Sequence, residues 1–107
     1  MSDPRDVYGL KADLGKDDIK SSFQYIRTYY LAKNAQTATV LDNFQALALT
    51  VRHRIVARWM NTQTTYHQQN KRRVYYLSME FLIGRILGNY MFNLGKEKDI
   101  EAAMREL

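Results

Sequence analysis

The sequence predicts a mostly α-helical chain with one strand candidate, forming part of a larger α/β protein. Three observations lead to this fold class. Apolar residues recur at helical spacing along most of the 107 residues. One predicted helix is longer than a domain of this size is wide. A single short stretch has the composition of a β-strand, and one strand alone cannot pair its backbone groups.

The composition is that of a globular protein, with 46% apolar and 25% charged residues. The lack of cysteine excludes disulfides and thiolate metal sites. The N-terminus has no apolar signal-peptide core, and no apolar run approaches the ~20 residues that span a bilayer. We therefore expect a soluble, cytoplasmic protein without a membrane segment. The net charge is +5, and many of the basic residues lie at 52–54, at Arg58 and at 71–73. These residues are compatible with an acidic partner, but solvated helix faces explain them more simply.

Residues 1–15 are expected to form a flexible arm, and residues 16–107 the helical part of the chain. The first helix is predicted over 17–34, with Asp17 as its N-cap. Apolar residues at spacings of four, three and four mark its buried face. These residues are Ile19, Phe23, Ile26 and Tyr30.

Thr39 and Asp42 have the spacing of a capping box, with Asp in place of the usual Glu or Gln. The helix that they open is predicted to run from Val40 to about Gln68, because no Gly or Pro interrupts it. At ~1.5 Å per residue it exceeds ~40 Å, whereas a compact chain of ~100 residues has a radius of gyration near 13 Å. Its predicted apolar stripe is Phe44, Ala48, Val51, Ile55 and Trp59.

The third region begins with the strand candidate, residues 73–78, which is rich in β-forming residues. A helix is predicted next over 80–94, with Gly95 as its C-terminal stop. A last helix is predicted from about Glu97 and is expected to be still running at Leu107. An overlong helix, an unpaired strand and an unfinished helix together indicate a piece of a larger protein, or a chain that folds by assembling with its own copies.

Glu80 is the strongest candidate for chemistry, because it follows the strand candidate where ligands bind in α/β proteins. A carboxylate there accepts hydrogen bonds from sugar hydroxyls. The simpler interpretation is a charge in the first turn of a helix, which the helix dipole favours. Gly84 and Gly88, four residues apart, indicate either close approach of a ligand or tight helix packing.

The remaining polar residues point to no specific chemistry. His53 and His67 lie far apart on one helix, so a metal site is not expected, and His53 among arginines is expected to be solvated. Aromatic residues near a basic cluster can stack on nucleic-acid bases, but at helical or strand spacing they are more often core. The aromatic residues in question are Tyr25, Tyr29, Tyr30, Tyr75 and Tyr76.

Three stretches closely resemble the N-terminal region of the α-glucan phosphorylases, the glycogen, starch and maltodextrin phosphorylase family. They are Trp59 with Gln63, then RRVYYLSMEFLIGR, then GNYMFNLG, and the resemblance runs from about Asp18 to the last residue. It implies two Rossmann-like domains of glycosyltransferase type in a homodimer. It also implies pyridoxal 5′-phosphate and reversible phosphorolysis of α-1,4-glucan to glucose 1-phosphate.

The resemblance assigns Glu80 to the active site, where it would bind or orient near the sugar and phosphate, and Gly84 and Arg85 to the same motif. Leu82 stands where animal enzymes place a Tyr near the cofactor, which indicates a bacterial-type member. The lysine that carries the cofactor would lie beyond residue 107.

The resemblance also bears on regulation. Trp59 and Gln63 match an AMP site at the dimer interface of animal enzymes, but His67 and Asn34 replace a key Tyr and a key Asp. The first residues contain no Arg-rich serine segment. We therefore expect weak or no AMP activation and no control by N-terminal phosphorylation.

For the chain itself we expect no catalysis, no bound cofactor and no metal, but self-association through exposed apolar faces. Two other function classes remain open. One is a stand-alone helical interaction module, and the other is a basic nucleic-acid-binding helical domain, although no nucleic-acid partner is expected.

Overall fold

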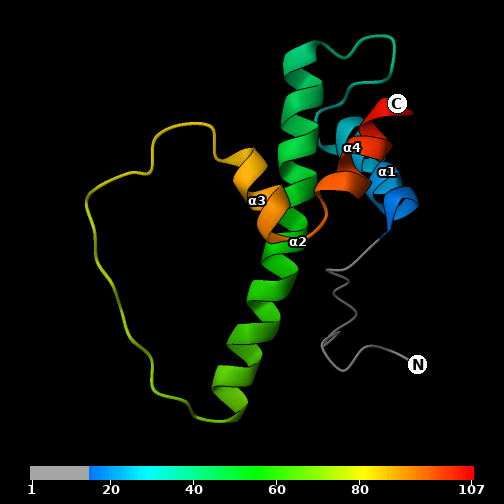
Figure 1. Cartoon of the computed structure of the whole chain (residues 1–107). Helices are drawn as coiled ribbons and strands as arrows, with labels where there is room; N and C mark the ends of the chain where they lie inside the picture. Colours follow the sequence, from blue (N-terminus) through cyan, green and yellow to red (C-terminus); the bar gives the residue numbers. More distant parts are fainter. Residues whose placement is uncertain (1–14) are drawn as a thin grey trace.

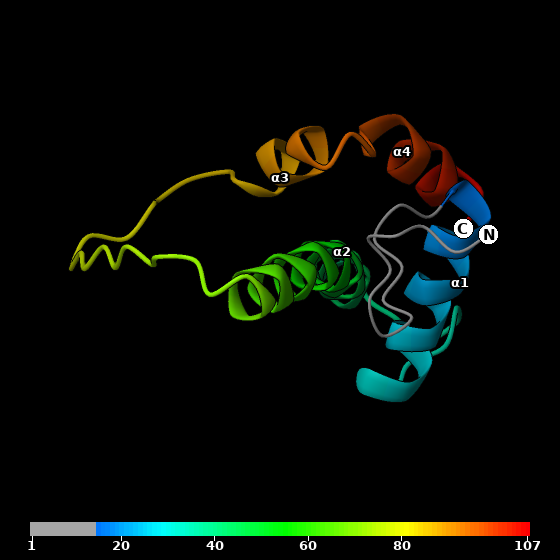
Figure 2. The ribbon, with the colours of Figure 1, turned by 90° about the horizontal axis from the view of Figure 1, so that it is seen from below.

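The computed structural model describes residues 15–107, so the predicted arm lies outside the described residues except for Gly15. Helices α1 and α4 lie side by side, α1 packs against the N-terminal half of α2, and α3 packs farther along α2 (Figure 1). A long connection leaves the far end of α2 and returns to α3 (Figure 2). The elements are α1 (Lys16–Tyr25), η2 (Ile26–Tyr30), α2 (Val40–Gln68), α3 (Leu87–Asn93) and α4 (Glu97–Arg105).

Helix α1 begins one residue earlier than predicted. Its N-cap is Gly15, which makes no side-chain cap bond, so the assignment of Asp17 as N-cap is wrong. Asp17 and Asp18 lie instead in the first turn, where the positive end of the helix dipole stabilises their charges. The acidic start therefore stabilises the helix through charge rather than through a capping hydrogen bond.

The predicted buried stripe of the first helix is confirmed for Ile19, Phe23 and Ile26, which are 1–2% exposed. Tyr30 was expected to complete it but is 65% exposed. The reason is that Ile26–Tyr30 is a π-helix, whose wider turns rotate later residues away from the α-helical stripe. The helix also ends at Tyr30 instead of residue 34, and Ala32 leaves it with a positive φ of 53°.

Helix α2 has the predicted bounds and the predicted cap. The backbone N–H of Thr39 donates to Asp42 Oδ2 at 2.9 Å, and the backbone N–H of Asp42 donates to Thr39 Oγ1 at 3.2 Å. At the other end Asn70 adopts φ 47°, and Lys71 N–H donates to Tyr66 O at 3.1 Å, which is a Schellman-type ending. The radius of gyration is 15.9 Å and the longest extent 49 Å, so the helix does outreach a compact body.

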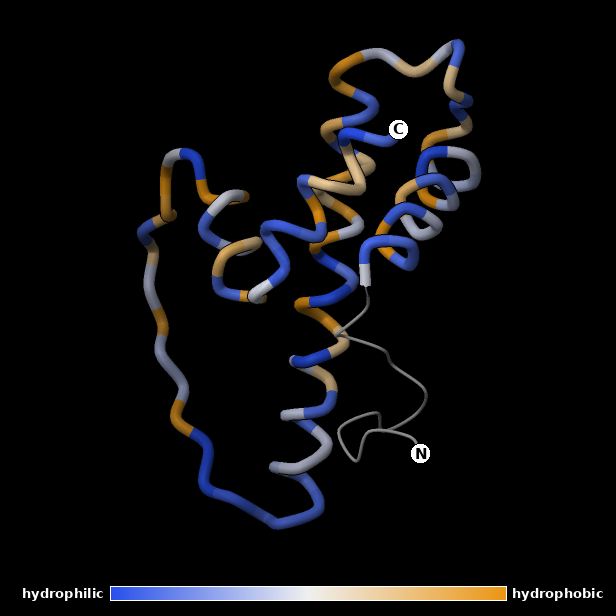
Figure 3. The backbone as a smooth tube through the Cα atoms, turned by 45° about the vertical axis from the view of Figure 1, so that its right-hand side comes forward, coloured by the Kyte–Doolittle hydropathy of each residue, from blue (hydrophilic) through white to orange (hydrophobic). Residues whose placement is uncertain are grey.

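The face of α2 that packs against α1 is not the predicted one. Phe44 and Trp59 are 55% and 58% exposed, and of the predicted stripe only Val51 is buried. The buried face consists mainly of small residues. Several bulky apolar side chains of α2 are exposed instead. Figure 3 shows hydrophobic and hydrophilic residues interspersed along this helix. The residues buried on α2 are Ala46, Thr50, Val51, Arg54 and Ala57.

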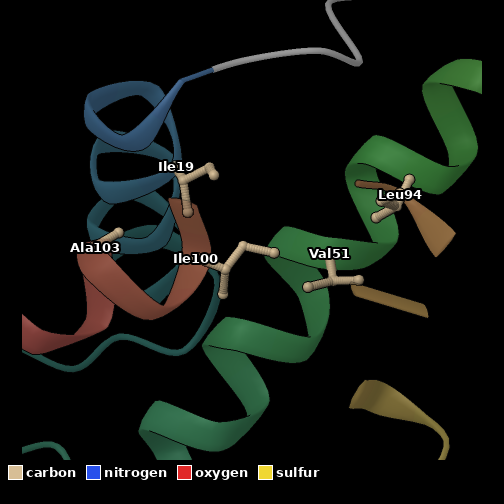
Figure 4. Packing of buried hydrophobic residues seen from close by; sticks show 5 residues of the cluster. All are labelled: Ile19, Val51, Leu94, Ile100 and Ala103. Atoms are coloured by element: carbon tan, nitrogen blue, oxygen red, sulfur yellow. The ribbon is translucent and has the colours of Figure 1, made fainter. Parts of the chain in front are cut away.

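The main core joins all four α-helical segments. Side chains from α1, α2 and α4 pack together with Leu94, the residue that follows α3 (Figure 4). These five side chains form one contiguous cluster. Burial of each large apolar side chain contributes about 1.5–3 kcal/mol. The cluster consists of Ile19, Val51, Leu94, Ile100 and Ala103.

The corner between α3 and α4 is built as the sequence predicts. Gly95 has φ 69°, its N–H donates to Phe92 O at 2.9 Å, and Lys96 N–H donates to Met91 O at 3.2 Å. Helix α4 starts at Glu97 as predicted but ends at Arg105, so the expectation that it runs through Leu107 is wrong.

The strand prediction is also wrong for the described residues 15–107, which contain no strand. Residues 73–78 are extended but unpaired, because no second strand lies within this range to accept their hydrogen bonds. The helix predicted from Glu80 begins only at Leu87. Gly84, with φ 124°, lies outside any helix, so it does not share a helix face with Gly88.

Candidate functional site

Glu80 lies on the connection between α2 and α3, not in the first turn of a helix. Residues 71–85 are exposed throughout, so Glu80 lies on an open segment and not in a cleft. Its apolar neighbours Met79 and Phe81 are 94% and 88% exposed. The helix-start interpretation of Glu80 is therefore wrong, and its charge needs another explanation.

The carboxylate of Glu80 is held by the residue two positions earlier. Ser78 Oγ donates a hydrogen bond to Glu80 Oε2, and the backbone N–H of Glu80 donates to Ser78 Oγ at 3.2 Å. The Ser78 hydroxyl, followed by the backbone N–H of Glu80, lowers the pKa of the Glu80 carboxyl. At neutral pH the side chain is an anionic hydrogen-bond acceptor. Sequence reasoning missed Ser78, and the only signal was a hydroxyl two residues before the acid.

Gly84, Arg85 and Leu82 share this connection with Glu80. A Cβ on Gly84 would have open space, but its φ of 124° favours glycine, so the residue serves to bend the chain. Leu82 is 75% exposed, and Arg85 is exposed. The four residues follow one another along an extended segment, and the structure does not enclose a common cavity with them.

The predicted regulatory residues are divided between the two ends of α2. Trp59, Gln63 and His67 are spaced by four on its C-terminal half and so share a face. Asn34 precedes the other end, which lies about 30 Å from Trp59 and about 40 Å from His67 by helix rise (Figure 1). There Asn34 Oδ1 accepts from Thr37 N–H at 2.9 Å, so its side chain stabilises a turn. A single copy of the chain does not bring these residues together.

Arg54 contradicts the expectation that the central basic cluster is solvated. It is only 6% exposed, and it donates to Ser22 Oγ at 3.0 Å and to Asp18 O at 3.4 Å. Burial lowers the pKa of Arg54, and the nearby Asp18 charge partly opposes that shift. Arg54 thus links α1 to α2 as a structural residue. Its burial could have been predicted from its spacing of four from Thr50 and eight from Ala46, which places the three residues on one helix face.

The two basic residues that precede Arg54 are more exposed to solvent than Arg54 is. Arg52 and His53 are exposed, as predicted for His53. Partial burial, then the charges of Arg54 and Arg52, lower the pKa of His53. Its ring lies 6.2 Å from that of Tyr30, edge to face. Nothing in this arrangement resembles a ligand set.

The cavity that the described residues enclose lies in the helical core and not beside Glu80. A space of about 10 Å³ lies in the core, lined by Ile19, Val51, Arg54 and neighbours, and has room for about one water molecule. Residues 15–107 contain no group of three acidic, His or Cys side chains that could hold a metal. No helix in the same range is long and apolar enough to cross a bilayer.

No protein-family model matches the chain. Its curated relatives are glycogen phosphorylases: it is 40% identical over 101 residues to the muscle form of Ovis aries, an alignment that covers 94% of the chain and 12% of that relative. It is 41% and 42% identical over 90 residues to the human brain and liver forms, covering 84% of the chain and 11% of each. The chain thus spans about 12% of the length of the relatives it matches. These relatives support the phosphorylase resemblance, but they are mammalian and give no support to a bacterial-type assignment.

Proposed function

We propose that this chain is the N-terminal part of an α-glucan phosphorylase, which transfers glucosyl units reversibly from α-1,4-glucan to phosphate and yields glucose 1-phosphate. The observation that carries the proposal is the 40% identity to a glycogen phosphorylase over 94% of the chain. Two Rossmann-like domains of glycosyltransferase type, a cytoplasmic homodimer and membership of the bacterial-type branch belong to the same proposal.

The bare surfaces of the chain support its place in a larger protein. The connection 71–85 is exposed along its whole length, and Phe44 and Trp59 of α2 are more than half exposed. Apolar surfaces of this extent normally contact another protein surface. In the proposed enzyme, residues 73–78 would pair with strands from the remaining sequence, and α2 would pack on the same domain.

Glu80 would form one wall of the sugar and phosphate site. Its carboxylate, whose pKa the Ser78 hydroxyl lowers, would accept hydrogen bonds and orient a sugar, and no nucleophilic role is proposed for it. Gly84 would provide the bend after this wall, and Arg85 a nearby positive charge. Pyridoxal phosphate would supply the acid–base group of the reaction, held by residues beyond this chain, while Leu82 offers it no hydroxyl.

The decisive observation is the length of the native reading frame, which the proposal expects to continue for several hundred residues. In that longer protein, Glu80→Gln should lower the rate of phosphate-dependent glucan breakdown roughly a hundredfold, because a positioned charge is lost at the reacting sugar. Glu97→Gln, the same change on the exposed first turn of α4, is the matched control and should keep full rate. Equal rates for both variants would contradict the assigned role of Glu80.

The proposed enzyme should respond weakly or not at all to AMP. Asn34 already uses its side-chain oxygen within its own turn, and His67 stands where the resemblance expects a Tyr. We expect less than a twofold rise in rate when AMP is added to the longer protein, and no response to N-terminal phosphorylation. Strong AMP stimulation would overturn this part of the proposal.

A helical interaction module is the second candidate, favoured by the same exposed apolar surfaces. A native reading frame that ends at Leu107 would support it. A nucleic-acid-binding role is less favoured, because the rings of Tyr25, Tyr29 and Tyr30 contact one another and Tyr30 also contacts His53, so these rings are engaged within the fold.

A further inference from the structure

The π-helical turn η2 lies where two apolar stripes compete for the core. Four residues after Ile26 comes Tyr30, which continues the stripe of a regular α-helix. Five residues after Ile26 comes Leu31, which continues the stripe of a π-helix. In the structure Tyr30 is 65% exposed, whereas Leu31 packs against the buried cluster of Phe23, Ile26 and Ala46. The register of this turn therefore decides which of the two side chains reaches the core.

The π-helical register places backbone strain at the end of the turn. The backbone N–H of Leu31 donates to Ile26 O at 3.1 Å, five residues back, and the chain then leaves the helix. Ala32 adopts a φ of 53° there, which is unfavourable for a residue that carries a Cβ. A regular α-helix that continued for two more residues would place the left-handed conformation at Asn34, and Asn accepts it more readily than Ala. Backbone strain therefore favours the α-helical register.

Side-chain contacts favour the observed π-helical register. Tyr30 is largely exposed in it, so its hydroxyl needs no buried hydrogen-bond partner. The Tyr30 ring also lies 6.2 Å from the His53 ring of α2, edge to face. Asn34 Oδ1 accepts from Thr37 N–H at 2.9 Å, which fixes the turn that follows. These contacts oppose the strain at Ala32, so each register has a favourable term that the other lacks.

We propose that residues 26–34 form a two-state element that exchanges Tyr30 and Leu31 on the core face. In the second state the turn is α-helical, Tyr30 packs against Phe23, and Leu31 faces solvent. Because the turn at Asn34 follows directly, it moves whenever the register changes. A ligand or partner that binds the Asn34 turn better in one register therefore shifts the population of both, which couples this turn to the helical core. This inference rests on the helical body and not on the proposed enzyme activity.

The first test measures exchange in the 107-residue chain by NMR relaxation dispersion of backbone amides, because helix register shifts take microseconds to milliseconds. The amides of residues 27–34 should show this exchange, whereas those of residues 55–62 in α2 should not. Ala32→Gly should lower the population of the α-helical register about fivefold, because Gly adopts a positive φ freely. Flat dispersion over 27–34, or a population that Ala32→Gly leaves unchanged, would overturn the proposal.

The second test asks which side chain reaches the core. Tyr30→Leu should make the α-helical register dominant, because the side chain to be buried no longer carries a hydroxyl. Nuclear Overhauser effects should then connect the methyl groups at position 30 with Phe23, and Leu31 should lose its contacts to the cluster. Tyr29→Leu is the matched control, since Tyr29 is 73% exposed and lies off the core face in either register. A Leu31 that stays in the cluster in Tyr30→Leu would overturn the proposed exchange.

Discussion

The helical body and the connection 71–85 both contain many apolar residues, but these are buried in the body and exposed in the connection. In the body, α1, α4 and the first half of α2 bury Phe23 and Ile100 to 1% and 4% exposure. In the connection, Phe81 and Ile83 are 88% and 91% exposed. A helix satisfies its own backbone groups, so short helices need only each other's side chains. A strand needs a second backbone, and the described residues offer none.

The largest expected effect is a difference in the free energy of unfolding between variants of Phe23 and Phe81. Phe23→Ala should lower the free energy of unfolding by ~4 kcal/mol, because it leaves a cavity at a fully buried site. Phe81→Ala, the same change on the connection, should alter it by less than ~0.5 kcal/mol. Urea unfolding followed by helical circular dichroism measures both. Similar losses for the two would mean that the connection is packed in solution.

A smaller effect separates two arginines of α2. Arg54→Ala should cost about 2 kcal/mol, because the hydrogen bonds to Ser22 Oγ and Asp18 O are lost at a buried site. Arg52→Ala, two residues away and exposed, should leave the unfolding midpoint nearly unchanged. The same urea titration tests this pair, and an equally mild effect of both changes would show that Arg54 does not link the helices.

The smallest expected effect is the pH dependence of the capping box. The backbone N–H and hydroxyl of Thr39 lower the pKa of Asp42 in the folded chain, whereas an unfolded Asp titrates near ~3.9. The carboxylate therefore adds stability above that value and loses it as the pH falls through the folded pKa. The stability gap between the native chain and Asp42→Asn should be constant near neutral pH and close below about pH 4. A gap that persists into strong acid would contradict the cap.

Local signals explain which parts of the fold could be predicted from the sequence. The capping box of Thr39 and Asp42 and the stop at Gly95 depend on residues within a few positions, so the bounds of α2 and the end of α3 were predictable. The π-helical turn of Ile26–Tyr30 was not, because periodicity assumes regular α-helix. Nor was the buried face of α2, since small residues such as Ala46 give a weak apolar signal while Phe44 and Trp59 give a strong one.

The candidate site shows the same division between local and distant information. The motif around Glu80 could be read from the sequence, and its exposed position on a connection could not, because helix and strand propensities overlap in residues 80–86. Its hydrogen bond with Ser78 is local and could be found by looking two residues back. The rest of any sugar site would come from residues far away in sequence, which no local pattern predicts.

The exposed face of α2 carries the single tryptophan of the chain, Trp59, at 58% exposure. Its indole is already largely hydrated in the folded state, so unfolding should shift its fluorescence emission only slightly. Any partner that covers this face should move the emission to shorter wavelength. The chain thus contains an intrinsic optical probe that responds to docking and is nearly silent to folding.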